Sequence, residues 1–181
     1  MIFLSAWMLV LVWLDPVQTG GLFGVTEGSI SFVSEAQLET IKASSKKVKG
    51  VLNTADNTFA FAVQNNSFHG FNSALQEEHF NENYMESDRF PQSTFSGKII
   101  EDVNLKTPGA YDVRAKGMLN IHGVTQERII RCTVSVQPGG ITIQSKFTVL
   151  LEDHRINVPR IVNEKIFPEI AVTVDLTLRP K

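Results

Sequence analysis

The sequence predicts an all-β protein built as an eight-stranded antiparallel barrel, and three observations support that prediction. Apolar and polar residues alternate along about eight segments, which is the pattern of strands with one buried face. Turn-forming stretches such as 53–57 and 138–140 separate most of these segments. Several strands reach about ten residues, and this length favours a barrel over a sandwich because closure leaves no unpaired strand edge.

The first three predicted strands precede residue 65. Ile30 and Phe32 share one face of the first strand. Residues 38–52 are predicted as a second, longer strand with Gly50 as a candidate bulge. In the third, Phe59, Phe61 and Val63 alternate with smaller or polar residues.

The five later strands each place their apolar residues on one face. These faces are Phe95, Gly97 and Ile99; Tyr111, Val113, Ala115, Leu119 and Ile121; Ile130, Cys132, Val134 and Val136; Ile141, Ile143, Phe147, Val149 and Leu151; and Ile170, Val172, Val174, Leu176 and Leu178. Residues 152–168 interrupt the pattern, and Val162, Ile166 and Phe167 are expected to pack that connection over a barrel end.

Residues 67–97 are rich in phenylalanine, although most of the segment is polar. Exposed aromatic rings gain nothing from burial, so this segment is expected to pack on the barrel. Residues 72–84 are predicted to form a short helix capped by Asn72 or Ser73, and Pro91 prevents its continuation. We therefore expect a helical and irregular lid over the barrel.

Composition restricts the possible partners. The chain has 181 residues, 43% hydrophobic and 20% charged, which fits one globular domain. A net charge of −2 argues against a nucleic-acid partner. Cys132 is the single cysteine, so no intrachain disulfide forms, and its place among apolar residues predicts a buried, inert thiol.

Residues 2–14 are almost uninterruptedly apolar and end at Asp15-Pro16. The run is too short to span a bilayer comfortably and suits the hydrophobic region of a signal peptide, although no Lys or Arg precedes it. An uncleaved anchor and a buried segment are the alternatives. The preferred interpretation is a signal peptide over 1–21, a domain over 22–181, and export to the periplasm or the medium.

Catalytic and metal-binding patterns are weak in this sequence. The histidines His69, His79, His122 and His154 have no paired ligand spacing, so no metal site is predicted. Asp153 and His154 would point to opposite faces of a strand and so form no hydrogen-bonded dyad. The acidic residues of 77–88 are expected to form a solvated face. No catalytic residues and no cofactor are predicted.

The barrel interior has two interpretations. Eight strands enclose a space that side chains fill or that holds one small ligand. Gly97, Ala115 and Gly117 are small and are expected to leave room, whereas periodicity alone favours a filled core.

In order and spacing, several short motifs together resemble the YceI-like domain family over residues 28–178. They are GSISF at 28–32, KVKG at 47–50, Ser67-Phe68, His79-Phe80 with Tyr84-Met85-Glu86, the FPxxTFxG pattern at 90–97, KGMLNIHGVT at 116–125, Phe147-x-Val149, and Asp153-x-x-Ile156-x-x-Pro159.

This resemblance implies a lipocalin-like barrel, usually periplasmic and often dimeric, whose apolar tunnel holds a polyisoprenoid such as a quinone tail or a prenyl pyrophosphate. It implies no catalytic residues. We therefore expect a carrier of a long-chain lipid, with these candidate ligand-binding residues: Phe32, Phe59, Phe61, Phe68, Phe71, Phe80, Tyr84, Phe90, Phe95, Leu119, Ile121, Phe147 and Val174. The alternatives are a filled barrel that acts in protein interaction or envelope stress and, less favoured, an enzyme that uses His122 or His154.

Overall fold

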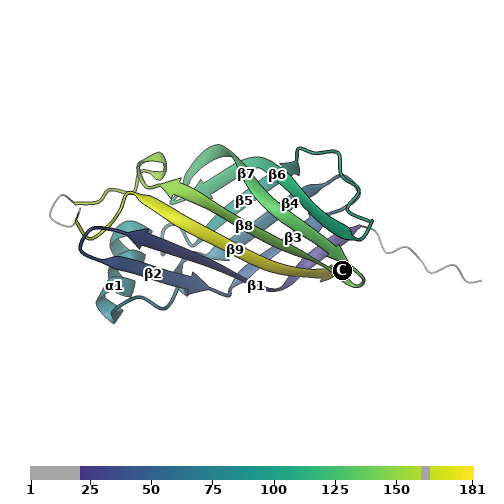
Figure 1. Cartoon of the computed structure of the whole chain (residues 1–181). Helices are drawn as coiled ribbons and strands as arrows, with labels where there is room; N and C mark the ends of the chain where they lie inside the picture. Colours follow the sequence, from purple (N-terminus) through teal and green to yellow (C-terminus); the bar gives the residue numbers. More distant parts are fainter. Residues whose placement is uncertain (1–20, 160–163) are drawn as a thin grey trace, which may run out of the picture.

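A computed structural model describes residues 21–159 and 164–181. Figure 1 shows the strands wound around one barrel, with α1 at one end and the C-terminus at the other. The predicted leader, except Gly21, and Val162 lie outside the described residues. In chain order the elements are β1 (Leu22–Glu35), β2 (Thr40–Ser45), β3 (Val48–Asn53), β4 (Thr58–Gln64), η1 (Asn65–Ser67), α1 (Ala74–His79), η2 (Phe80–Tyr84), β5 (Gln92–Ile99), β6 (Gly109–Ile121), β7 (Val124–Gln137), β8 (Gly140–Leu150), η3 (Glu152–His154) and β9 (Glu169–Pro180).

The nine strand segments of the described residues make an eight-stranded closed barrel, as predicted, because β2 and β3 act as one interrupted strand. Both pair with β1 in the same antiparallel register: Ile30 faces Ser45, and eight residues further along, Leu22 faces Asn53. Every other neighbouring pair is antiparallel, and β1 closes the barrel by pairing with β9.

The bulge predicted at Gly50 is wrong. Gly50 faces Phe61 in regular register, and the strand breaks at 46–47 instead. The register shift lies in β1, between Val25 and Glu27, on the side that pairs with β9. Lys46 and Lys47 at this break are exposed to solvent, so their charges need no protein partner.

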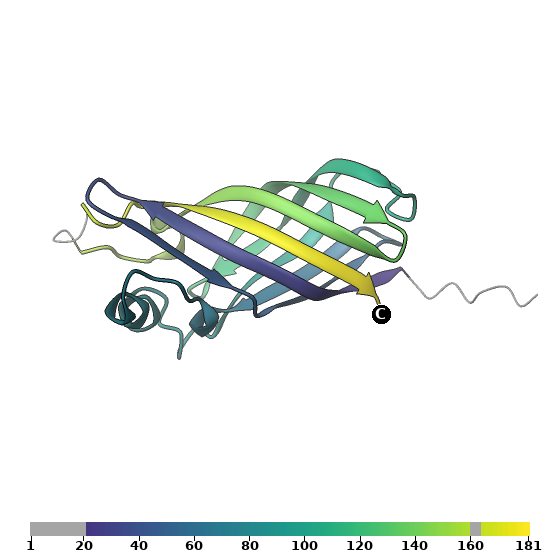
Figure 2. The same ribbon diagram turned by 60° about the horizontal axis from the view of Figure 1, so that its bottom comes forward.

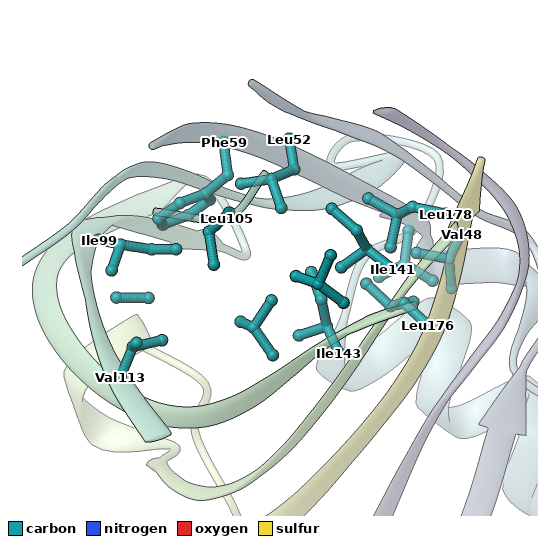
Figure 3. Close-up of a cluster of buried hydrophobic side chains, with 14 of the residues drawn as sticks. Val48, Leu52, Phe59, Ile99, Leu105, Val113, Ile141, Ile143, Leu176 and Leu178 are labelled. Carbon is teal, nitrogen blue, oxygen red and sulfur yellow. The ribbon is translucent and has the colours of Figure 1, made fainter. Parts of the chain in front are cut away.

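One end of the barrel is a packed core. Figure 3 shows Leu105 pointing into the barrel near Leu52, Phe59 and Ile99, with Ile141 close by. Leu105 comes from the β5–β6 loop and is only 1% exposed. That loop therefore plugs the end near the C-terminus. The other buried strand residues of the same hydrophobic cluster are Ala43, Val48, Val63, Val113, Ala115, Val134, Val136, Ile143, Leu176 and Leu178. Two of them, Val63 and Leu176, also border the cavity described below.

Gly97 and Gly117 do not create space inside the barrel, contrary to the prediction. They face each other across β5 and β6, and a Cβ on either would collide with the backbone of the facing strand. Their role is to let two strands approach closely where the sheet curves. Ala115 is buried in the core and does not line the cavity described below.

The predicted helix is confirmed and consists of two parts. The Ser73 side chain accepts a hydrogen bond from the Gln76 amide and caps α1. The helix then widens to a π-helical turn at η2, where the Met85 amide donates to the carbonyl of Phe80. Among the described residues, no helix combines the length and apolar character needed to span a membrane.

Candidate functional site

A cavity of about 490 Å³ occupies the barrel at the α1 end. Its wall is built from the inward faces of the strands, and residues of α1 and η2 line its mouth. Figure 2 shows α1 at the barrel end opposite the C-terminus. Most of the predicted residues line the cavity: Phe32, Phe61, Phe68, Phe71, Phe80, Tyr84, Phe95, Leu119, Ile121, Phe147 and Val174. The barrel is thus packed at one end and hollow at the other.

Two predicted lining residues lie elsewhere. Phe59 sits two residues deeper along β4 than Phe61, is buried in the packed core, and has its ring 4.9 Å from that of Phe95. The Phe90 ring packs on His122 at 4.7 Å, outside the cavity wall. Phe90 follows η2, and its amide donates to the Glu86 carbonyl, which holds it at the β6–β7 turn.

The sequence reasoning missed several lining residues. They lie on the same apolar faces, deeper than the predicted residues or nearer the mouth, or come from the connections: Ile30, Ile41, Met85, Val149, Leu151, Ile156, Ile166, Ile170, Val172 and Leu176. Alternation along β1, β8 and β9 was the signal for most of them. Ile166 was expected to pack over a barrel end, and the structure places it on the cavity wall.

Four phenylalanines form an aromatic cluster between β1 and the lid. The Phe80 ring centroid lies 5.4 Å from Phe32, 5.8 Å from Phe68 and 5.1 Å from Phe71. Aromatic pairs at such spacings stabilise by about 0.5–1.5 kcal/mol each beyond their buried area. The cluster therefore holds the lid on the barrel while its rings also line the cavity.

Polar groups at the mouth fix the lid to the β1–β2 turn. Glu39 accepts hydrogen bonds from Gln76 at 2.6 Å and Asn72 at 3.1 Å, both through Oε1. On the other side of the turn, the Leu38 amide donates to the Glu164 carbonyl. Charged or titratable lining side chains among the described residues are Glu39, His79, Tyr84 and Lys165, all towards the mouth. The deep wall is almost entirely hydrocarbon.

His122 and His154 meet outside the cavity. The His122 ring lies 3.1 Å from both the His154 carbonyl, through Nδ1, and Glu86 Oε1, through Nε2. His154 is fully buried, and its Nδ1 bonds the Val124 carbonyl. Burial lowers the pKa of His154 below 6.5. Neither ring lines the cavity. The cluster instead joins the segment that follows η2, which contains Glu86, to the β6–β7 turn and to η3.

Asp153 and His154 are not strand neighbours as expected, because they lie in the 3-10 turn η3. Their side chains form no hydrogen bond to each other among the described residues, although for a different reason than the predicted strand geometry. His154 is buried and bonds the Val124 carbonyl, whereas Asp153 is half-buried.

The other candidate reactive groups have structural partners. His69 Nδ1 lies 2.8 Å from Glu77 Oε1 at the surface. Cys132 is half-buried and not buried as predicted, yet desolvation raises the pKa of its thiol to about 11 and so disfavours the reactive thiolate. Within residues 21–159 and 164–181, no group of three or more His, Cys, Asp or Glu side chains is placed to hold a metal.

A closed antiparallel barrel with an apolar hollow at one end defines a class of small-ligand-binding barrels. Comparison with family models then identifies the group within this class. The chain belongs to the YceI-like domain family, whose model matches residues 21–178.

Solved structures share the fold at low sequence identity. A polyisoprenoid binding domain from Saccharophagus degradans, implicated in plant cell wall breakdown, is 14% identical with a TM-score of 0.75, over 90% of this chain and 99% of that one. BcnA from Burkholderia cenocepacia is 15% identical with a TM-score of 0.67, over 83% and 95%. The YCEI protein of Campylobacter jejuni is 13% identical with a TM-score of 0.58, over 98% and 99%. A search of curated proteins finds no significant match.

Proposed function

We propose that this protein is a non-catalytic carrier that holds the hydrocarbon chain of a long isoprenoid lipid, such as a quinone tail or a polyprenyl chain, in the barrel cavity. The observation that carries the proposal is the hollow of about 490 Å³ with an apolar wall. Its size lies within the range of about 300–1,000 Å³ that is usual for small-molecule sites. The description of the Saccharophagus degradans domain as polyisoprenoid binding supports the same ligand class.

The energetics favour a long apolar chain over a polar ligand. Each buried methylene contributes about 0.8 kcal/mol, and a hydrocarbon wall offers few partners for polar groups. Phe147, Val172 and Val174 present only carbon to the cavity. The tail, rather than the head group, is therefore expected to supply most of the affinity.

Two alternatives have less support. A filled barrel that acts only in interaction or stress tolerance leaves the cavity unexplained. An enzyme that uses His122 or His154 needs a substrate to reach them, yet neither ring lines the cavity.

Ligand uptake tests the proposal directly. We expect decylubiquinone to bind the delipidated protein, whereas the same quinone ring without its tail does not bind measurably. Organic extraction of freshly purified protein followed by mass spectrometry is expected to find a prenyl or other long-chain species. If extraction yields no such species and the protein takes up no decylubiquinone, the carrier role is wrong.

Export and pairing extend the proposal. We propose a periplasmic or secreted location on the basis of the apolar run at 2–14. N-terminal sequencing of the protein from its native host tests cleavage near residue 21, and an intact N-terminus in the cytosolic fraction would contradict it.

A homodimer, expected from the resemblance, stays a prediction that light scattering tests.

A further inference from the structure

The mouth of the cavity carries one carboxylate in a fixed position. Glu39 lines the cavity and is half-buried, and its Oε1 accepts hydrogen bonds from the side-chain amides of Gln76 and Asn72. Asn72 also bonds the Thr40 carbonyl, which ties the lid to the same turn. Two amide donors thus hold Glu39 in place beside the space that a ligand head group would occupy.

The second oxygen of this carboxylate, Oε2, differs from Oε1 in its protein contacts. Both recorded hydrogen bonds of the Glu39 side chain reach Oε1, and Oε2 has no protein donor in the part of the chain that the structure describes. No ion pair to Glu39 occurs among those residues either. A carboxylate oxygen only accepts hydrogen bonds when ionised, so Oε2 suits a ligand hydroxyl.

The basic side chains that line the cavity are poorly placed to bind an anion. Lys165 also lines the cavity, but it is exposed, and an exposed ammonium on a flexible stem contributes little to a charge pair. His79 is exposed as well. The fixed negative charge is therefore the main electrostatic feature of the lining, and it repels a phosphorylated head group.

We propose that Glu39 determines head-group specificity, so that the cavity takes isoprenoids with an uncharged hydroxyl head, such as a polyprenol or a quinol, in preference to prenyl pyrophosphates. The ligand hydroxyl donates a hydrogen bond to Glu39 Oε2 at the mouth while the isoprenoid tail lies along the apolar wall. This inference rests on the proposed carrier function and assigns the chemical class of its ligand.

The test compares two ligands with the same tail, geranylgeraniol and geranylgeranyl pyrophosphate, by displacement of an apolar fluorescent probe from the cavity. We expect the wild-type protein to bind the alcohol about tenfold or more tightly than the pyrophosphate, as a repulsion of this kind predicts. Glu39→Gln keeps an acceptor for Gln76 but removes the charge. The ratio of the pyrophosphate dissociation constant to the alcohol dissociation constant is therefore expected to fall by about threefold or more.

One control variant separates this effect from general charge. Glu35 is exposed at the end of β1, beside the same turn, and does not line the cavity, so Glu35→Gln is expected to leave the ratio unchanged. Lys165 lines the mouth, so Lys165→Ala tests the competing assignment, and its effect on the ratio is expected to be smaller than that of Glu39→Gln because an exposed ammonium contributes little. A large loss of pyrophosphate binding in Lys165→Ala would show that the lysine holds the head group and would overturn the proposal.

The remaining outcomes are also decisive. Equal or tighter binding of the pyrophosphate by the wild-type protein, or a ratio that Glu39→Gln does not change, rejects the role of Glu39 and leaves the carrier function intact. Failure of both ligands and of decylubiquinone to bind rejects the carrier function itself.

Discussion

At the scale of single residues, the contact between Glu86 and His122 connects the lid exit to the β6–β7 turn. Both ring nitrogens of His122 face acceptors, the Glu86 carboxylate and the His154 carbonyl. The hydrogen bond from His122, followed by that from Arg89, lowers the pKa of Glu86 below its usual 4.5.

This contact predicts acid sensitivity. Because the pKa of Glu86 is lower in the folded state, its stabilising contribution is present above about pH 4.5 and is lost as the pH falls through the lowered value. In Glu86→Gln the charge is absent, so its free energy of unfolding should decline less steeply on acidification. Urea unfolding of both proteins between about pH 3 and pH 6 measures the difference.

Other carboxylates do not obscure this comparison. The pKa values of Asp56 and Glu101 are also lowered, by hydrogen bonds from Thr58 and Arg114 respectively, but both groups are present in the two proteins. Parallel stability curves for wild type and Glu86→Gln would contradict the prediction.

At the scale of elements, the sequence predicted which face of each strand turns inward but not how deep each side chain lies. Phe59 and Phe61 share a face of β4, yet one belongs to the packed core and the other to the cavity. Depth depends on strand tilt and register around a closed barrel, which arise from long-range pairing. Alternation within one strand contains no such information.

The connections show the same limit. The cap at Ser73 was readable because a hydroxyl at that position satisfies a free helix amide locally. The break at 46–47, the π-helical turn η2 and the 3-10 turn η3 were not readable, since each depends on contacts with segments distant in the chain. Glu39 was missed as a site residue because Gln76 and Asn72, which hold it, are more than thirty residues away.

The β5–β6 loop is predicted to act as a structural plug. Leu105 is 1% exposed within the packed core, so Leu105→Ala should lower the free energy of unfolding by about 2–5 kcal/mol through lost burial and a residual void. Ile100 belongs to the same loop and is 42% exposed. Ile100→Ala should therefore change stability by less than about 0.5 kcal/mol.

Urea denaturation of the two variants measures the plug. The Asn57 side chain bonds the Val103 carbonyl and holds the loop at the barrel end, so the loop has little freedom to collapse around a shortened side chain. Equal, small effects of Leu105→Ala and Ile100→Ala would show that the loop does not seal this end.

At the scale of the whole molecule, the barrel divides its interior between two tasks. The end near the C-terminus is filled by side chains such as Leu105 and Ile141 and supplies stability, whereas the α1 end is left hollow (Figures 1 and 3). A hollow apolar wall forgoes packing contacts that a filled core would make. Binding a lipid chain restores those contacts, so we expect the ligand to stabilise the fold.

This division predicts that a Val→Phe substitution weakens ligand binding at the hollow end and lowers stability at the packed end. Val174→Phe adds a ring where the wall borders empty space, so it should leave the unfolding free energy of the delipidated protein within about 1 kcal/mol while weakening decylubiquinone binding about tenfold or more. Val134 is 1% exposed in the packed core, and Val134→Phe should cost about 1–3 kcal/mol by overpacking. Urea denaturation and ligand titration distinguish the two, and equal destabilisation by both would mean that side chains fill the barrel throughout.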